Sequence, residues 1–422
     1  MYRNKRHNKK APWLISVAAL FFVPFAQIQA APTIEHWQTQ QGLGVYYVHV
    51  PQLPMLDLRL VFSAGSTRDA DKAGLAMMTN AILPMGAAGL NADQLAEAFE
   101  SVGAGASNGA ARDMAWFTLR TLTLPAEQEK ALNTWLTVIT TPDFPEKDFA
   151  RMKKQTLVGL QAEKQSPSAI ANKAFFKHLY GDHPYASPQN GTEASINALT
   201  VADLKAFYQQ YYVAKNGTLA IVGNIDRGTA EQLANRLSKR LAQGEKAAPI
   251  PKVKPLAEAK TIRIPFPSQQ AHIMIGQTGN KRGDKDYFTL YLGNHIMGGG
   301  GFTSRLMKEV RDARGLSYSV YSYFSAMRES GPFLLSLQTK LSQTDEAIKV
   351  AREVVKKFQK EGASAEELVE AKKDVNGGFP LNVASNADIV EYLAMIGFYN
   401  LPLDYLNTFT QKIDKITQAD IL

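Results

Sequence analysis

The stretch FTLRTLTLPAEQEKALNTWL, residues 117–136, is similar to FLLSLQTKLSQTDEAIKVAREV, residues 333–354. In both, apolar and polar residues first alternate, as in a half-buried strand, and apolar residues then recur at helical spacing. Two further pairs follow at nearly the same separation: FPEKDFARMKKQ with GASAEELVEAKKD, and LTVADLKAF with ITQADIL. The offset between matching segments stays between 216 and 219 residues. This constancy indicates a tandem duplication of an α/β unit.

The duplication predicts two domains, 31–243 and 260–422, joined by a linker at 244–259 that is rich in Pro, Ala and Lys. Strand-like runs alternate with amphipathic helical stretches along both; they are GVYYVHV, LDLRLVFSAG, AWFTLRTLTL, GTLAIVGNI, HIMIGQTG and FLLSLQTKL. After LTVADLK the first repeat continues into a final strand, whereas the second stops at ITQADIL. The second domain is therefore expected to be C-terminally short and to expose a sheet edge.

Residues 1–30 have the order of a secretory signal. A basic stretch, RNKRHNKK, precedes an apolar run of 14 residues that contains Pro24, and a small-residue end follows before APTIE. Cleavage is expected after Ala30. The alternative is an uncleaved membrane anchor, but the run is shorter than the roughly 20 residues that span a bilayer. The sequence predicts an exported, periplasmic protein with no stable membrane span after cleavage.

Composition excludes several classes of protein. With 45% hydrophobic and 20% charged residues, the 422-residue chain is neither disordered nor a multi-span membrane protein. The net charge of +8 comes largely from five basic residues in the signal; the other 42 basic residues face 39 acidic ones, which gives no reason to expect nucleic-acid binding. Cysteine is absent, which excludes disulfides, thiolate metal sites and cysteine nucleophiles.

Short motifs alone identify no active site. GASNG, from Gly105 to Gly109, fits the G-x-S-x-G pattern, but an alternating strand follows where a hydrolase elbow needs a helix. GGGG, from Gly298 to Gly301, lacks the Gly-Lys-Ser/Thr end of a phosphate loop and is either a hinge or a loop that contacts peptide. No two of the six histidines after the signal are three or four residues apart, so a structural role is expected for each: His36, His49, His178, His183, His272 and His295.

Three longer stretches resemble the insulinase/pitrilysin-type metallopeptidase family, which includes proteins like the mitochondrial processing peptidase. They are FSAGSTRDADKAGLAMMTNAIL, the run from KHLYGDHPY to AIVGNID, and IMGGGGFTSRLMKEVRDARGLSYSVYSYF. The resemblance covers essentially the whole chain after the signal. It implies an α+β fold in which each repeat is a mainly antiparallel sheet with helices packed on one face, and in which the two halves form a clamshell.

The family's zinc site is an inverted His-x-x-Glu-His motif on a helix, with a further Glu about 77 residues on. Aligned with GLAMMTNAIL, the two His positions fall on Met77 and Ala81, the Glu falls on Asn80, and the last ligand falls on Gly159. Glu163 lies one helical turn further along and is not taken as a ligand. A thioether, an amide, a methyl group and a hydrogen cannot hold zinc or activate water. No cofactor is therefore expected in this chain.

The family's other catalytic contribution is retained. By resemblance, Arg311 and Tyr318 would contact the substrate near the scissile bond, and Gly298, Gly299, Gly300 and Gly301 would form a substrate loop. A guanidinium and a phenol can donate hydrogen bonds to a peptide carbonyl and to the oxyanion that forms on it. Without the family, Arg311 would be read as a surface ion pair and Tyr318 as a packed side chain. The family's peptide-binding edge strand would be Ser107–Arg112, but GASNGAARD departs from its usual pattern.

Three hypotheses follow. The first is a zinc-less exported subunit that pairs with a zinc-bearing paralogous peptidase and completes its peptide site, with zinc in the partner only. The second is a stand-alone pseudopeptidase that binds peptides or a protein partner without hydrolysis. The third, an active peptidase with relocated ligands, needs a zinc site that the sequence does not supply. The sequence identifies neither the peptide substrate nor the partner, and it does not decide between a homo- and a hetero-oligomer.

Overall fold

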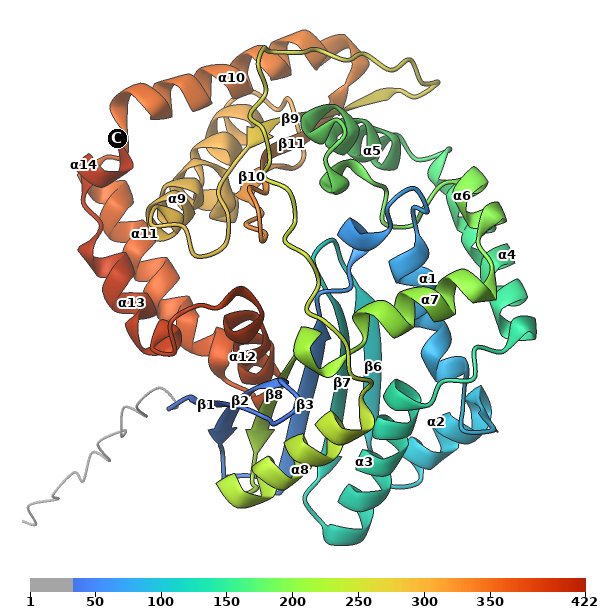
Figure 1. The fold of residues 1–422 in the computed structure, drawn as a ribbon. Coiled ribbons are helices and arrows are strands. Elements are labelled where there is room, and N and C mark those ends of the chain that lie inside the picture. Colours follow the sequence, from blue (N-terminus) through green and yellow to red (C-terminus); the bar gives the residue numbers. More distant parts are fainter. Residues whose placement is uncertain (1–32) are drawn as a thin grey trace, which may run out of the picture. The chain divides into compact units, whose positions relative to one another are not determined.

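The computed structural model describes residues 33–422 (Figure 1). The predicted signal, residues 1–30, lies outside the described residues. Within residues 33–422, no helix is both long and apolar enough to cross a membrane. Residues 243–269 form neither helix nor strand and contain the predicted linker, although the exact domain limits stay a prediction.

The first half is built on a six-stranded sheet with the order β1-β2-β8-β3-β7-β6. All neighbouring strands are antiparallel except β2 and β8. Alternation explains β7, since Phe117 and Leu119 are buried on one face while Thr118 and Arg120 point to the other. The strands are β1 (Glu35–Gln38), β2 (Gly44–His49), β3 (Met55–Phe62), β6 (Gly105–Ala110), β7 (Ala115–Leu122) and β8 (Gly217–Gly223).

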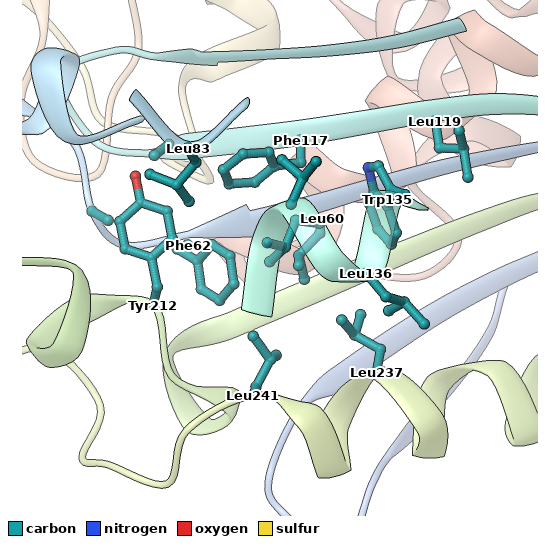
Figure 2. Close-up of a cluster of buried hydrophobic side chains, with 14 of the residues drawn as sticks. Leu60, Phe62, Leu83, Phe117, Leu119, Trp135, Leu136, Tyr212, Leu237 and Leu241 are labelled. Atoms are coloured by element: carbon teal, nitrogen blue, oxygen red, sulfur yellow. The ribbon is translucent and has the colours of Figure 1, made fainter. Parts of the chain in front are cut away.

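Helices of the first half bury the main hydrophobic core against one face of this sheet (Figure 2). Phe117 from β7, Trp135 from α3 and Leu237 from α8 meet in that core. The short strands β4 (Gly86–Ala87) and β5 (Leu90–Asn91) pair beside it. The helices are α1 (Leu75–Ile82), α2 (Ala92–Glu100), α3 (Pro125–Thr140), α4 (Glu146–Glu163), α5 (Pro167–Tyr180), α6 (Glu193–Ala198), α7 (Val201–Tyr211) and α8 (Arg227–Arg240).

The second half repeats this order on a smaller sheet, β10-β11-β9. Helix α10 buries Ala347, Val350, Val354 and Phe358, a spacing that places one apolar face on the core. Two π-helical turns lie in this half: His295–Gly299, which includes the first two glycines of the tract, and Met307–Asp312, which follows it. The elements are β9 (Gln270–Thr278), β10 (Val320–Phe324), β11 (Pro332–Lys340), α9 (Tyr287–Asn294), α10 (Thr344–Glu361), α11 (Ala365–Gly378), α12 (Asn386–Tyr399), α13 (Tyr405–Lys415) and α14 (Gln418–Ile421).

The two halves exchange a helix. Helix α12 of the second half packs on β8, β3 and β2 of the first sheet, and α5 of the first half packs on β9. Both helices hold the same place in the repeat, since α12 begins 219 residues after α5. A second core therefore forms on the other face of the first sheet, where Val61, Ala220 and Val222 meet Leu393. The resemblance implied helices on one face only; the exchanged helix covers the second.

The mixed α and β architecture predicted from the sequence is confirmed, and every quoted strand-like run contains a strand. The helical stretches also lie where the pattern predicts them, including α3, which begins at Pro125, a residue whose fixed backbone angle suits the first helical turn. In the second sheet β9 lies at an edge, whereas its counterpart β3 is paired on both sides.

Candidate functional site

The four residues at the family's zinc positions lie on α1 and α4. Met77, Asn80 and Ala81 are on α1, where Asn80 is only 1% exposed, and Gly159 is on the exposed side of α4. Neither Gly159 nor Ala81 carries a donor atom, and the Asn80 amide is neutral. These residues do not fit a zinc ion. Among residues 33–422, no group of three or more His, Asp or Glu side chains is arranged to hold a metal.

Asn80 instead ties α1 to the edge strand β6. Its Oδ1 atom and its backbone oxygen each accept a hydrogen bond from Asn108 Nδ2, at 2.8 Å. Its Nδ2 atom donates to the Tyr212 hydroxyl at 3.4 Å. Burial raises the pKa of Tyr212, so this phenol stays protonated at neutral pH. The position where the family has a general base therefore holds an amide with a structural role, and its neighbour Tyr212 is a protonated phenol.

Glu163, the acidic residue one turn beyond Gly159, is engaged elsewhere. It forms an ion pair with Lys173 and accepts a hydrogen bond from Asn190 Nδ2 at 2.9 Å. Burial raises its pKa, but Lys173 and Asn190 outweigh burial and leave the pKa below its usual value. Glu163 is thus a charged member of a surface network that links α4 to α5.

Arg311 and Tyr318 come together in the second half. The Arg311 guanidinium carbon lies 5.4 Å from the centroid of the Tyr318 ring and 4.8 Å from that of Phe302. Tyr318 is 87% exposed and Phe302 is 71% exposed. The only acidic partner of Arg311 within residues 33–422 is its sequence neighbour Asp312, at 3.9 Å. The surface ion pair expected without the family is therefore weak, and Tyr318 does not pack inside the protein.

Phe302 was missed from the sequence. It follows the glycine tract directly and places a large apolar ring against Arg311. Its position between the glycine tract and TSRL gave no periodic signal that would have singled it out. The structure joins the glycine tract and the Arg311–Tyr318 pair through this one side chain.

Most of the glycine tract packs against its own chain. A Cβ atom on Gly298 would lie 2.3 Å from Ser322 Oγ, and one on Gly300 would lie 2.7 Å from the His295 carbonyl oxygen. Gly301 differs: its φ is +61°, and a Cβ atom there would meet nothing within 4 Å. Gly298 therefore allows close backbone approach to β10, whereas Gly299 and Gly300 pack against Asn294 and His295, and Gly301 is the member that faces open space.

The family's edge strand corresponds to β6 and the residues after it. Ser107 lies in the middle of β6, and its Oγ atom is 2.6 Å from Thr118 Oγ1 on β7, so GASNG is a strand and not a nucleophile elbow. Arg112 is not available to substrate, because its guanidinium stacks on Phe176 at 3.6 Å and its Nε donates to the Tyr185 carbonyl. Burial lowers the pKa of Arg112 to about 10.

The helix–strand pair of the first half has a counterpart in the second. Asn294 at the end of α9 donates from Nδ2 to the Ser322 carbonyl at 2.9 Å, and the Ser322 hydroxyl donates to Asn294 Oδ1 at 2.7 Å. Asn294 and Ser322 each lie 214 residues after Asn80 and Asn108. Both repeats therefore fasten the same helix to the same edge strand with a side-chain amide, which supports the duplication.

The histidines have local roles. His49 Nδ1 donates to the Ile225 carbonyl at 2.9 Å, and His183 Nε2 donates to the Pro251 carbonyl at 2.8 Å. Burial lowers the pKa of His295, and Asp374, at 3.8 Å from its Nε2 atom, offsets this only in part. His295 is accordingly a neutral ring at pH 7.

Two family models match the chain. The model described as insulinase (peptidase family M16) matches residues 45–193, and the one described as the peptidase M16 inactive domain matches residues 198–375. A crystal structure of a peptidase M16 inactive domain from Pseudomonas fluorescens superposes with a TM-score of 0.89 at 41% identity, over 92% of this chain and 93% of that chain.

Some curated relatives are named as zinc proteases and one as a non-peptidase homologue. A Helicobacter pylori protein named non-peptidase homolog YmxG is 25% identical over 401 residues, which is 94% of this chain and 91% of its own length. A Bacillus subtilis protein named uncharacterized zinc protease YmxG is 22% identical over 353 residues, 83% of this chain and 85% of its own.

Proposed function

This chain belongs to the insulinase family of peptidases, M16, and we propose that it acts there as the exported, zinc-less subunit of a two-chain peptidase. It is an inactive-type member of the family, in keeping with its similarity to an M16 inactive domain and to a non-peptidase homologue. The proposed partner is a zinc-bearing relative that lacks a complete substrate-contacting set. Export rests on the signal-like residues 1–30, and the periplasm is the proposed location.

The observation that carries the proposal is the pairing of Arg311 with Tyr318. A chain that had lost all function of the peptidase site would have no reason to keep a half-buried guanidinium beside a phenol that is 87% exposed. Aromatic residues and arginine are enriched at the surfaces where one protein binds another. The zinc positions are degenerate in the same chain, so the pair has no zinc of its own to serve.

The chemistry assigned to this chain is binding and charge stabilisation. Zinc in the partner would supply the activated water. Arg311 and Tyr318 would donate hydrogen bonds to the peptide carbonyl, and these bonds strengthen as negative charge develops on its oxygen. Gly301, whose backbone faces open space, would approach the peptide main chain without a side chain in the way.

The test begins with affinity capture of the tagged chain from the exported fraction of its native cells. We expect a stoichiometric partner with an intact His-x-x-Glu-His motif. Arg311→Ala and Tyr318→Phe should then lower kcat/KM of the assembled pair by roughly 10²-fold each, because each removes a donor to the developing charge. Assembly, measured by gel filtration, should not change.

Arg314→Ala is the matched control. Arg314 lies three residues from Arg311 on the same segment but pairs with Glu309, so its loss should leave the kinetics unchanged. Unchanged kinetics for both Arg311→Ala and Tyr318→Phe in an assembled complex would contradict the proposal. Recovery of the chain alone, with peptide affinity that no partner alters, would instead favour a stand-alone, non-catalytic peptide-binding protein.

A further inference from the structure

Four half-buried arginines meet at the junction between the two halves of the chain, and the duplication relates them in pairs. Arg282 lies 214 residues after Arg68, and Arg328 lies 216 residues after Arg112. Arg68 and Arg282 occupy the segments that lead into α1 and α9, whereas Arg112 and Arg328 occupy the β6–β7 and β10–β11 turns. Each repeat therefore contributes two cations to the junction.

Hydrogen bonds hold these four segments against one another. The residue before Arg68 donates from its main chain to the Arg112 carbonyl at 3.0 Å, and Arg282 N donates to the carbonyl of the residue before Arg328 at 2.7 Å. Across the junction, Arg328 N donates to Asp113 Oδ2, which follows Arg112, at 2.8 Å. The arginine-bearing segments of the two halves are therefore bonded into one cluster.

The four guanidinium groups have no carboxylate partner. Within residues 33–422, every ion pair of an arginine belongs to another arginine. The acceptors of the four are all neutral: a serine hydroxyl, a tyrosine hydroxyl and two backbone carbonyls. Asp113 donates no help by hydrogen bonding, since its oxygens accept from two tyrosine hydroxyls and from the Arg328 main chain. Half-buried cations without an anionic partner are costly.

Arg68 and Arg328, one from each half, both keep an open donor. Arg68 Nη2 donates to Ser63 Oγ at 3.0 Å, and Arg328 Nη2 donates to the Phe398 carbonyl at 2.6 Å. Their Nε atoms are buried without a partner, whereas their Nη1 atoms have no partner within residues 33–422 and are not enclosed. A ligand that approaches from solvent can therefore reach one N–H group of each guanidinium.

The two guanidinium groups also lie within electrostatic reach of each other. Burial lowers the pKa of Arg68; Tyr211 and Asp113 offset part of this, and the charge of Arg328 adds to it. Arg282 lies close to Arg328, because the guanidinium carbons of both lie over the Tyr399 ring, at 5.6 and 5.5 Å from its centroid. Like charges held together in this way attract an anion.

We propose that the junction binds a phosphate group, free or as a monoester, between the Nη1 atoms of Arg68 and Arg328, with Arg112 and Arg282 adding positive charge around it. Guanidinium groups form strong, charge-assisted hydrogen bonds to phosphate oxygens. A tetrahedral phosphate presents oxygens on several sides, so it can accept from both halves at once, and its double charge offsets both cations. The site uses neither the Arg311–Tyr318 pair nor a partner chain, so it does not rest on the two-chain function.

The test is titration calorimetry of the purified chain with inorganic phosphate, glycerol 3-phosphate and acetate, at an ionic strength kept constant with chloride. At least one of the two phosphates should bind saturably at one site with a Kd of about 1 mM or lower, and acetate should bind at least about 10-fold more weakly. The tighter of the two phosphates identifies the form that the site takes, ester or free anion, and either supports the proposal. No saturable binding of either phosphate up to about 10 mM, or equal binding of acetate, would overturn it.

Arg328→Gln locates the binding. It removes one of the two guanidinium groups, so the affinity for phosphate should fall at least about 10-fold. Arg352→Gln is the matched control: Arg352 lies exposed on α10, and its loss changes the net charge equally, so it should leave the affinity unchanged. Unchanged affinity in a folded Arg328→Gln variant would overturn the assignment.

Thermal unfolding gives a second readout. Phosphate should raise Tm of the unaltered chain and of Arg352→Gln, but much less that of Arg328→Gln, because only a bound ligand stabilises the folded state by mass action. Equal rises in all three proteins would indicate a general salt effect and contradict the proposal. If Arg328→Gln does not fold, Arg328→Lys takes its place: it keeps the charge but loses the guanidinium fork, so its affinity for phosphate should still fall several-fold.

Discussion

The Arg311 guanidinium carbon lies 5.4 Å from the centre of the Tyr318 ring, and that ring is 87% exposed. Each cation–π contact at an exposed site contributes about 0.5–1 kcal/mol. We therefore expect Arg311→Ala to lower the free energy of unfolding by no more than about 2 kcal/mol, and Tyr318→Phe to leave it nearly unchanged. Urea denaturation of the purified chain measures both.

Arg305 provides the comparison for Arg311. It lies on the same half but is largely buried, donates to Glu367 Oε1 at 2.7 Å and to the Gly362 carbonyl at 2.9 Å, and lies over Phe358. Arg305→Ala should cost about 3 kcal/mol or more, because it leaves Glu367 partly buried without its partner. Equal losses for Arg311→Ala and Arg305→Ala would identify Arg311 as a structural residue.

The glycine tract allows a second comparison within a few residues. A Cβ atom on Gly298 would clash with Ser322 Oγ at 2.3 Å and with Leu306 Cδ1 at 2.5 Å. Gly298→Ala should therefore destabilise the protein by about 1–3 kcal/mol through overpacking. Gly301→Ala meets no neighbour, and only its positive φ opposes it, at about 1 kcal/mol.

Denaturation of the two glycine variants, with Gly301→Asn as a third, measures the difference. Asparagine tolerates the left-handed region better than alanine, so Gly301→Asn should be the least destabilised of the three. If Gly298→Ala were as stable as Gly301→Asn, the close approach of the tract to β10 would be wrong.

The sequence predicted the regular elements well because local patterns determine them. The alternation in AWFTLRTLTL matches the alternating burial of β7, and the apolar positions of α10 are the ones that are buried. The exchange of α5 and α12 between the halves was not predicted, since no local pattern records which sheet a helix covers. A partial signal existed in GTLAIVGNI, whose continuous apolar run is typical of a strand buried on both faces, as β8 is.

The residues of the candidate site could likewise be located in part from the sequence, whereas their contacts could not. Spacing against the family located Met77, Asn80, Arg311 and Tyr318, but it could not show that the Asn80 amide bonds to Asn108. Asn280 could not be singled out from the sequence. What distinguishes it is that both polar atoms of its side chain are buried without a hydrogen-bond partner among residues 33–422. Such residues emerge only when distant segments have been brought together.

Asp69 predicts a dependence of stability on pH. It is 1% exposed, and its carboxylate accepts hydrogen bonds from Gly74 N and Ala76 N at the start of α1, both at 2.8 Å. Burial raises the pKa of Asp69 to about 7, because these two bonds offset only part of the lost hydration. In the unfolded chain the pKa is near 3.8. Between pH 4 and 7 the folded state thus holds a proton that the unfolded state has released.

The contribution of Asp69 to stability therefore falls as the pH rises through this range, by a few kcal/mol in all at about 1.4 kcal/mol per pKa unit. The contribution is complete below about pH 4 and is lost above about pH 7. Asp69→Asn removes the titration, so the free energy of unfolding of the unaltered chain minus that of the variant should decline between pH 4.5 and 7.5. A difference that grows with pH would show that the backbone bonds dominate over burial.

Asp113 provides the last prediction, since it joins the halves of the chain. It is 3% exposed; Oδ1 accepts from the Tyr185 hydroxyl at 2.9 Å, and Oδ2 accepts from the Tyr399 hydroxyl at 3.0 Å and from Arg328 N at 2.8 Å. Tyr185 belongs to the first half, whereas Tyr399 and Arg328 belong to the second. Asp113→Ala leaves these three donors without their acceptor and should cost about 3–5 kcal/mol, since each buried donor left unpaired costs about 1–3 kcal/mol.

Tyr399→Phe isolates the link between the halves, because it removes one hydrogen bond to the carboxylate and keeps the ring. A hydrogen bond to a charged group contributes about 1.5–3 kcal/mol, so this variant should lose that amount in chemical denaturation. In the double variant with Asp113→Ala the loss should be less than the sum, because the bond is already gone. Strict additivity would mean that Tyr399 and Asp113 stabilise the protein independently, and that the carboxylate supports only its own loop.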